Sequence, residues 1–147
     1  MQNLNKENLN VLGMFAKLIL PFIVAFSLYI QVSGDSAPGG GFQAGAVLSA
    51  VLVMVDIIFG SEVIFAYFSI RKLIIYASAG VIIYLLPGII SLFLQKGFLN
   101  YFALNFLSTE PQKAGIVLIE FGVGMTVFSS LSIIYLKFIN LLRNEKS

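Results

Sequence analysis

Long apolar runs separated by short polar segments dominate this sequence. Four of them cover residues 11–33, 42–60, 73–94 and 114–139 and hold few charged residues. A helix rises about 1.5 Å per residue and needs roughly 20 apolar residues to cross the hydrocarbon of a bilayer, so each run is long enough for one span. Helices are the only open-ended structure that pairs all its backbone groups in lipid. The pattern predicts an all-α integral membrane protein, a four-helix transmembrane bundle in a single domain over 1–147.

Two further apolar stretches, residues 63–70 and 98–107, are rich in aromatic residues. Both are too short to cross a bilayer. We expect them to lie along the membrane interface or to be tucked against the bundle.

The positive charges predict an orientation, because Lys and Arg in short loops favour the cytoplasmic side. With the N-terminus inside, seven of the nine Lys and Arg fall at the cytoplasmic face and two, Lys96 and Lys113, fall outside. We therefore expect both termini to be cytoplasmic in a multi-pass protein of the cell (inner) membrane. The seven are Lys6, Lys17, Arg71, Lys72, Lys137, Arg143 and Lys146.

Composition agrees with a membrane protein and excludes several other classes. The chain is 59% hydrophobic and 11% charged, with a mean hydropathy of +0.95, unlike an ordinary soluble domain. It has no cysteine and no histidine, which removes disulfides, thiol catalysis and nearly every zinc or copper site. Its scattered positive charges form no basic stripe for nucleic acid, and no phosphate-binding loop is present. We expect no catalytic residues, no metal, no cofactor and no nucleic-acid partner.

The most unusual segment opens the second apolar run with residues that disfavour a helix. It reads Pro38, Gly39, Gly40, Gly41, Phe42 and Gln43, followed by Ala44 and Gly45. Consecutive glycines allow positive φ angles and let another backbone, an ion or water come close. A plain tight turn between two helices would use the same residues. The alternative is a shaped backbone element at a subunit contact or on an ion path.

Small residues recur at helical spacing in the second and fourth apolar runs. Such rows let neighbouring helices approach closely, so we interpret them as packing faces. The rows are Gly41, Gly45 and Ser49, with Asp56 on nearly the same face, and Gly122, Thr126 and Ser130.

Glu120 lies about six residues into the fourth apolar run. A charged group deep in a span costs roughly 3 kcal/mol on insertion scales unless it is neutralised, hydrated or paired. One interpretation is a neutral, hydrogen-bonded residue that ties two helices together. The other is a proton or cation relay group, with Gly124 one turn away leaving room beside the carboxylate.

Asp56 is the second carboxylate inside an apolar run, about one turn from the cytoplasmic end of its span. A salt bridge to Lys17, Arg71 or Lys72 at the membrane edge would explain it, and a relay role is the alternative. Asp35, beside the glycine run, is most simply a solvated turn residue.

Three stretches carry a family resemblance. They are Leu20-Pro21-Phe22, residues 34–45 around the glycine run, and Glu120-Phe121-Gly122-Val123-Gly124-Met125-Thr126-Val127. Together they resemble the B subunit of the multi-subunit monovalent cation/proton antiporters of the Mrp or Mnh type, over most of the chain from Leu18 to about Phe138. The chain has Asp35 and Ala44 where that family usually has His and Gly, and the first departure replaces a titratable cation by an anion.

The resemblance implies an accessory membrane subunit of a heteromeric Na⁺/H⁺ antiporter complex that supports cation export coupled to proton uptake. Implied partners are other antiporter subunits, including large subunits similar to those of respiratory complex I, and the lipid bilayer. Two membrane carboxylates and no internal repeat also make a poor stand-alone antiporter. The alternatives are the corresponding subunit of a membrane-bound hydrogenase or related complex-I-like pump, and a purely structural scaffold subunit. None of these makes the chain itself an enzyme.

Overall fold

The computed structural model describes residues 2–34, 38–104 and 111–144, and within these ranges it contains helices and connecting segments but no strand. Four helices are long and apolar enough to cross a membrane, over Val11–Val32, Gly41–Phe59, Ile70–Phe93 and Gln112–Leu142, which confirms the predicted number of spans. The elements are α1 (Gln2–Val32), α2 (Gly41–Phe59), α3 (Ser61–Tyr67), α4 (Ile70–Phe93), the short 3₁₀ helix η1 (Tyr101–Leu104) and α5 (Pro111–Asn144).

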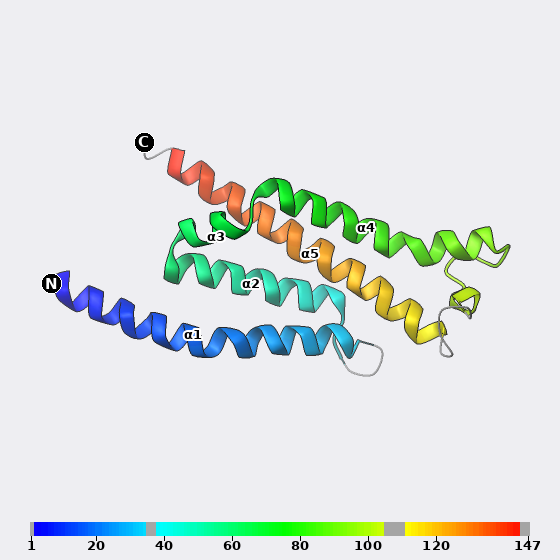
Figure 1. The fold of residues 1–147 in the computed structure, drawn as a ribbon, viewed down its shortest axis with the longest axis horizontal. Helices are drawn as coiled ribbons and strands as arrows, with labels where there is room; N and C mark the ends of the chain where they lie inside the picture. Colours follow the sequence, from blue (N-terminus) through cyan, green and yellow to red (C-terminus); the bar gives the residue numbers. More distant parts are fainter. Residues whose placement is uncertain (1, 35–37, 105–110, 145–147) are drawn as a thin grey trace.

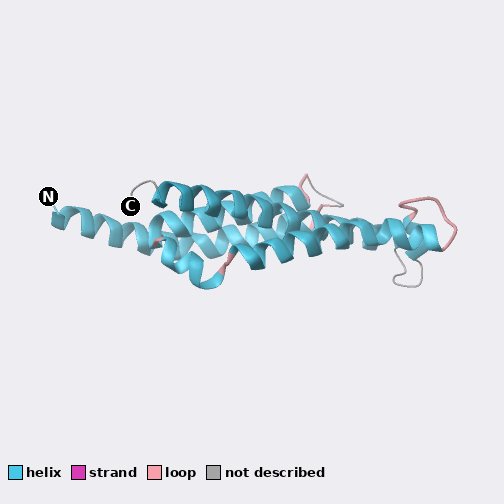
Figure 2. Ribbon diagram, turned by 90° about the horizontal axis from the view of Figure 1, so that it is seen from above, coloured by secondary structure: helices cyan, strands magenta, loops and turns pink. Residues whose placement is uncertain are grey.

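The four long helices form an open row in the order α1, α2, α5, α4 (Figure 1). Within the described residues, α4 packs on α5 and η1, and its backbone does not approach that of α1 or α2. Turned by 90° in Figure 2, the molecule is flatter and elongated. The predicted four-helix bundle is therefore open rather than closed into a ring. Because α5 carries small residues on two opposite faces, it accepts α2 on one side and α4 on the other.

The start of α1 and the end of α5 lie toward the same end of the molecule's long axis, along which the helices run. We call this end of the molecule the terminus end (Figure 1). The α3 segment and the start of α4 lie toward the same end. The α1–α2 connection and η1 lie at the other, the loop end. An even number of spans places the first and the last helix end on the same side, as observed here.

Local sequence explains where the helices begin. Ser69 precedes α4, and its Oγ accepts a hydrogen bond from the Lys72 backbone N–H at 3.3 Å, an N-cap interaction. Gly60 has a φ of 91°, which lets the chain turn from α2 into α3. Pro111 is the first residue of α5, where its missing N–H is not needed.

The apolar core lies toward the terminus end, where α3 covers the row. Leu52, Ile64, Leu73 and Leu136, from four different helices, form one buried cluster. The Phe68 and Phe128 rings meet edge to face next to it, with their centroids 6.0 Å apart. The first short apolar stretch is thus tucked against the row, which confirms one of its two predicted placements.

At the loop end, the described part of the second short stretch also packs on the helices. The Phe98 ring lies against Gly88 of α4 and the Tyr101 ring against Gly115 of α5, so that a Cβ on either glycine would overlap a ring. Residues 105–107 of this stretch lie outside the described residues.

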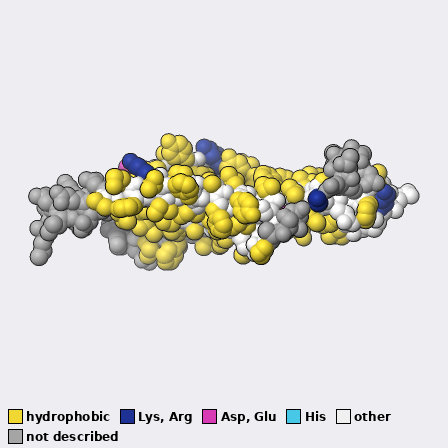
Figure 3. All heavy atoms as spheres, turned by 90° about the horizontal axis from the view of Figure 1, so that it is seen from below, with side chains coloured by type: hydrophobic (Ala, Val, Ile, Leu, Met, Phe, Trp, Pro, Cys, Tyr) yellow, Lys and Arg dark blue, Asp and Glu magenta, His cyan; other side chains and the backbone are white. Residues whose placement is uncertain are grey.

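Hydrophobic side chains cover much of the outer surface (Figure 3). Within the most apolar window of each candidate span, only 11–28% of residues are buried by the chain itself. An apolar surface this large must be covered by lipid or by other proteins.

Candidate functional site

A close helix crossing lies at the loop end, between the glycine run of α2 and the Glu120 segment of α5. A Cβ on Gly41 would overlap the Glu120 carbonyl oxygen, and one on Gly45 would lie 2.5 Å from the Gly124 carbonyl oxygen. Backbone atoms cannot rotate away as a side chain can. The two helices are therefore in backbone contact, and glycine at both positions is required for it.

The Glu120 carboxylate lies against the backbone of the α1–α2 connection. A Cβ on Gly34 would overlap its oxygens, and one on Gly40 would lie 3.2 Å from Oε1. Gly40, the residue before α2, has a φ of 151°, which L side chains rarely adopt. Backbone of the glycine run thus lies directly against one side of this carboxylate. Both interpretations of the run, a plain turn and a shaped backbone element, must accommodate this contact with Glu120.

Gln31 of α1 belongs to the same site and was missed from the sequence. Its Oε1 lies so close to Gly124 that a Cβ there would overlap it. Its Nε2 is buried without a hydrogen-bond partner among the described residues. One turn earlier, the buried Ser27 hydroxyl donates to the Ala44 carbonyl oxygen at 2.8 Å. The spacing of Ser27 and Gln31 in an otherwise apolar run was the available signal, since it marks the α1 face that meets α2.

A cavity of about 210 Å³ opens beside Gln31, between α1, α2 and α5. The Gln31 amide is the polar side chain in its otherwise apolar lining. Its lining residues are Leu28, Gln31, Leu48, Phe121, Gly124, Met125 and Phe128.

Three side chains of the glycine run are exposed. Phe42 is 62% exposed, and Pro38 and Gln43 are exposed as well. Gly39 packs on the Ile30 side chain. Of the predicted six residues, Gly40 and Gly41 lie against Glu120, while the exposed side chains remain candidates for a subunit contact. Asp35 lies outside the described residues.

The opposite face of α5 packs on α4 through a second glycine pair. A Cβ on Gly122 would lie 2.7 Å from the Gly80 carbonyl oxygen, and the reverse distance is the same. The Thr126 hydroxyl donates to the Gly122 carbonyl oxygen at 2.8 Å and lies 3.4 Å from that of Ala77. Both predicted rows are confirmed as packing faces, except that Ser129 rather than Ser130 is fully buried.

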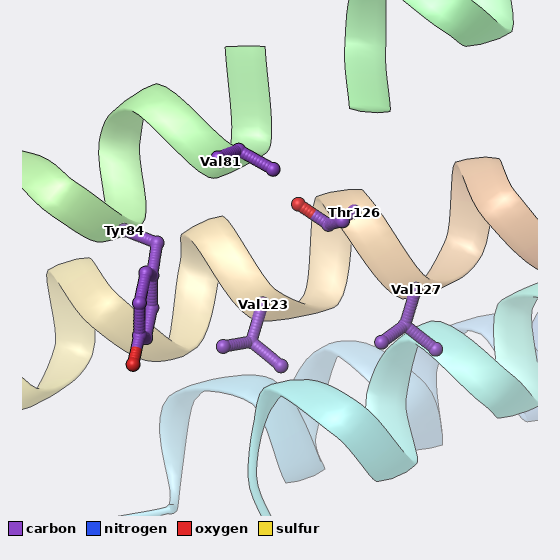
Figure 4. Close-up of a pocket in the computed structure, with 5 residues that line it drawn as sticks. All are labelled: Val81, Tyr84, Val123, Thr126 and Val127. Atoms are coloured by element: carbon purple, nitrogen blue, oxygen red, sulfur yellow. The ribbon is translucent and has the colours of Figure 1, made fainter. Parts of the chain in front are cut away.

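Next to this crossing lies an apolar groove of about 210 Å³ (Figure 4). It offers no charged side chain, which distinguishes it from the surroundings of Glu120. It is lined by Val81, Tyr84, Val123, Thr126 and Val127.

Asp56 is bound differently from our expectation. Its Oδ2 accepts a hydrogen bond from the Tyr135 hydroxyl at 2.8 Å. The expected salt bridge to Lys17, Arg71 or Lys72 is wrong, because Arg71 and Lys72 are exposed and the Lys17 ammonium lies 5.8 Å from the centre of the Phe59 ring. The lysine reaches the aromatic face instead of the carboxylate.

The site near Glu120 thus combines a carboxylate, the Gln31 amide, whose Nε2 has no hydrogen-bond partner among the described residues, and glycine backbone. Carboxylate and carbonyl oxygens can hold a proton, water or a monovalent cation, and nothing in this set of groups provides a nucleophile with its base. The arrangement suits ion or proton binding.

Comparison with known proteins decides the family. Residues 11–133 match the family model described as a domain related to the MnhB subunit of Na⁺/H⁺ antiporters. The chain belongs to the MnhB family. The matched residues contain the glycine run, Glu120, Asp56 and Gly124 but not Tyr135.

Individual MnhB relatives align over most of their length. The B subunit of the Na⁺/H⁺ antiporter of Bacillus subtilis (strain 168) is 30% identical over 139 residues, which cover 88% of this chain and 96% of that protein. The putative antiporter protein mnhB2 of Staphylococcus haemolyticus (strain JCSC1435) is 31% identical over 127 residues, covering 83% and 88%. Its counterpart in Staphylococcus aureus (strain Newman) is 27% identical over 137 residues, covering 86% and 96%. The family resemblance inferred from the sequence is confirmed.

Proposed function

We propose that this chain is an accessory membrane subunit of a heteromeric Na⁺/H⁺ antiporter complex, supporting cation export coupled to proton uptake. Its family and the names of its relatives support this role, and they favour an antiporter over a hydrogenase-type pump or a bare scaffold. The chain is then a transporter component and no enzyme. Its partners are the other antiporter subunits, and Na⁺ and H⁺ are the transported ions of the complex.

The observation that carries the site proposal is the meeting of Glu120 with Gly34 and Gly40. A carboxylate that only ties two helices together needs a side-chain or backbone donor, but not a glycine wall with a cavity nearby. We propose Glu120 as a proton or cation relay group, with the glycine run as part of the ion path or of the adjoining subunit contact.

The membrane placement is also part of this proposal. The chain is a multi-pass protein of the cell membrane, one membrane domain with both termini cytoplasmic and the glycine run outside. The location of the first and last helix ends at one end of the row and the positive charges of the sequence support this placement.

Reconstitution tests the accessory role. The purified full chain in liposomes should give no Na⁺-dependent proton flux, because its large apolar surface and its site need other subunits. A tagged chain isolated in mild detergent should bring the large antiporter subunits with it, and that complex should transport. Robust flux from the pure chain would contradict the proposal, as would purification of the chain without any of those subunits.

A further inference from the structure

Asp56, at the terminus end, is a buried carboxylate that uses one of its two oxygens in a hydrogen bond among the described residues. Only 7% of the residue is exposed. Its Oδ2 accepts the Tyr135 hydrogen bond, but its Oδ1 is buried and has no hydrogen-bond partner among the described residues. A charged carboxylate with one oxygen buried and unpaired is unfavourable, and a proton on that oxygen removes the charge.

No described positive charge is packed against Asp56 to offset the free-energy cost of burying its charge. Tyr135 is the titratable group in direct contact with the carboxylate, and its hydroxyl is neutral. The charged side chains described at this end of the row are all exposed to their surroundings rather than packed around Asp56. They are Lys17 of α1, Glu62 of α3, Arg71 and Lys72 of α4, and Lys137 of α5.

A second buried polar atom without a hydrogen-bond partner among the described residues lies on α5, one turn from Tyr135. It is the Oγ of Ser132, which is fully buried. Buried carboxylate oxygens are normally paired with a donor, so a proton on the unpaired Oδ1 of Asp56 would account for its burial.

We propose that Asp56 is a proton-binding site at the terminus end, with the proton carried on Oδ1. Tyr135 is a positioning residue, because it holds Oδ2 between α2 and α5. Asp56 lies three residues before the end of α2, so its proton exchanges with the aqueous phase at that end. The site is separate from Glu120 and does not depend on a transport role for the chain.

Infrared titration of the full chain in lipid bilayers tests this. At a pH where exposed carboxylates are ionised, the difference spectrum between the parent chain and Asp56→Asn should show a protonated carboxyl band. Glu62→Gln, which removes an exposed carboxylate at the same end, is the matched control and should retain the band. Tyr135→Phe should also retain it, shifted to higher wavenumber because the carbonyl loses a donated hydrogen bond, and with a displaced midpoint pH.

Two results would overturn the proposal. One is a difference spectrum between the parent chain and Asp56→Asn that shows no protonated carboxyl band at that pH. The other is a Tyr135→Phe band with unchanged wavenumber and midpoint, which decides the matter even if Asp56→Asn fails to fold. Neither result touches the accessory role, because the readout needs no transport.

Discussion

The two ends of the α2–α5 pair hold their carboxylates by different means. At the loop end, backbone meets backbone through Gly41, Gly45 and Gly124, and Glu120 faces a wall of glycine. At the terminus end, large side chains form the core, and Asp56 is held by a hydrogen bond from Tyr135. A group walled by backbone keeps its surroundings whatever its protonation, whereas a group held by one side chain depends on that partner. We therefore expect substitutions in the backbone contact at the loop end to cost more stability than substitutions at the terminus end.

The largest effect is expected from Gly45→Val, which breaks the backbone crossing. The added carbons would meet the Gly124 carbonyl oxygen and the Phe128 N–H, so the helices must separate. We expect a loss of about 3 kcal/mol, the upper part of the range for overpacking. Yield of the assembled complex, measured by size-exclusion chromatography, should fall sharply. Gly97→Ala is the control, because Gly97 has open space around it; equal yields from both variants would show that the crossing tolerates separation.

A smaller loss is expected from Gly40→Val, which strains the glycine wall without entering the crossing. A β-branched residue at a φ of 151° costs about 2 kcal/mol, and its side chain would push on the Glu120 carboxylate. Antiport by the assembled complex should fall more than the yield does. Full activity with normal yield would show that the glycine run is a plain turn.

The smallest loss belongs to the terminus end. Tyr135→Phe keeps the ring but leaves Oδ2 of the buried Asp56 without its donor, so we expect a destabilisation of about 1.5 kcal/mol. Thermal unfolding of the full chain in detergent measures it. A loss as large as that of Gly45→Val would mean that Asp56 and Tyr135 hold the row together, and would erase the contrast between the two ends.

The sequence alone predicts the spans well because apolar run length and helix rise leave little choice. It also predicts the packing rows, since Gly41, Gly45 and Ser49 recur at helical spacing in one run and Gly122 and Thr126 in another. The open row could not be predicted, because periodicity shows which residues face a neighbour but not which helix is that neighbour. For the same reason the expected partner of Asp56 was wrong: Tyr135 is 79 residues away, and a lysine on the next helix was the nearer choice by charge.

The glycine run and Glu120 could each be recognised from the sequence, but the contact between them could not. The glycine run and Glu120 were each chosen for local reasons, residue type in one case and depth in the membrane in the other. Their contact depends on α2 and α5 crossing at Gly41 and Gly124. Gln31 was missed because one amide near the end of an apolar run is ordinary until its neighbour is known.

The most direct measurement is Na⁺-dependent proton flux across a range of pH, in vesicles holding the complete complex with Glu120→Gln or Glu120→Ala. Gln keeps the shape and hydrogen bonding but removes titration, whereas Ala also leaves a gap. A relay role predicts normal complex yield for Gln, with antiport reduced or its pH profile displaced. An unchanged pH profile in the Gln variant, with only Ala lowering the yield, would contradict the relay role and leave Glu120 as a residue that joins two helices.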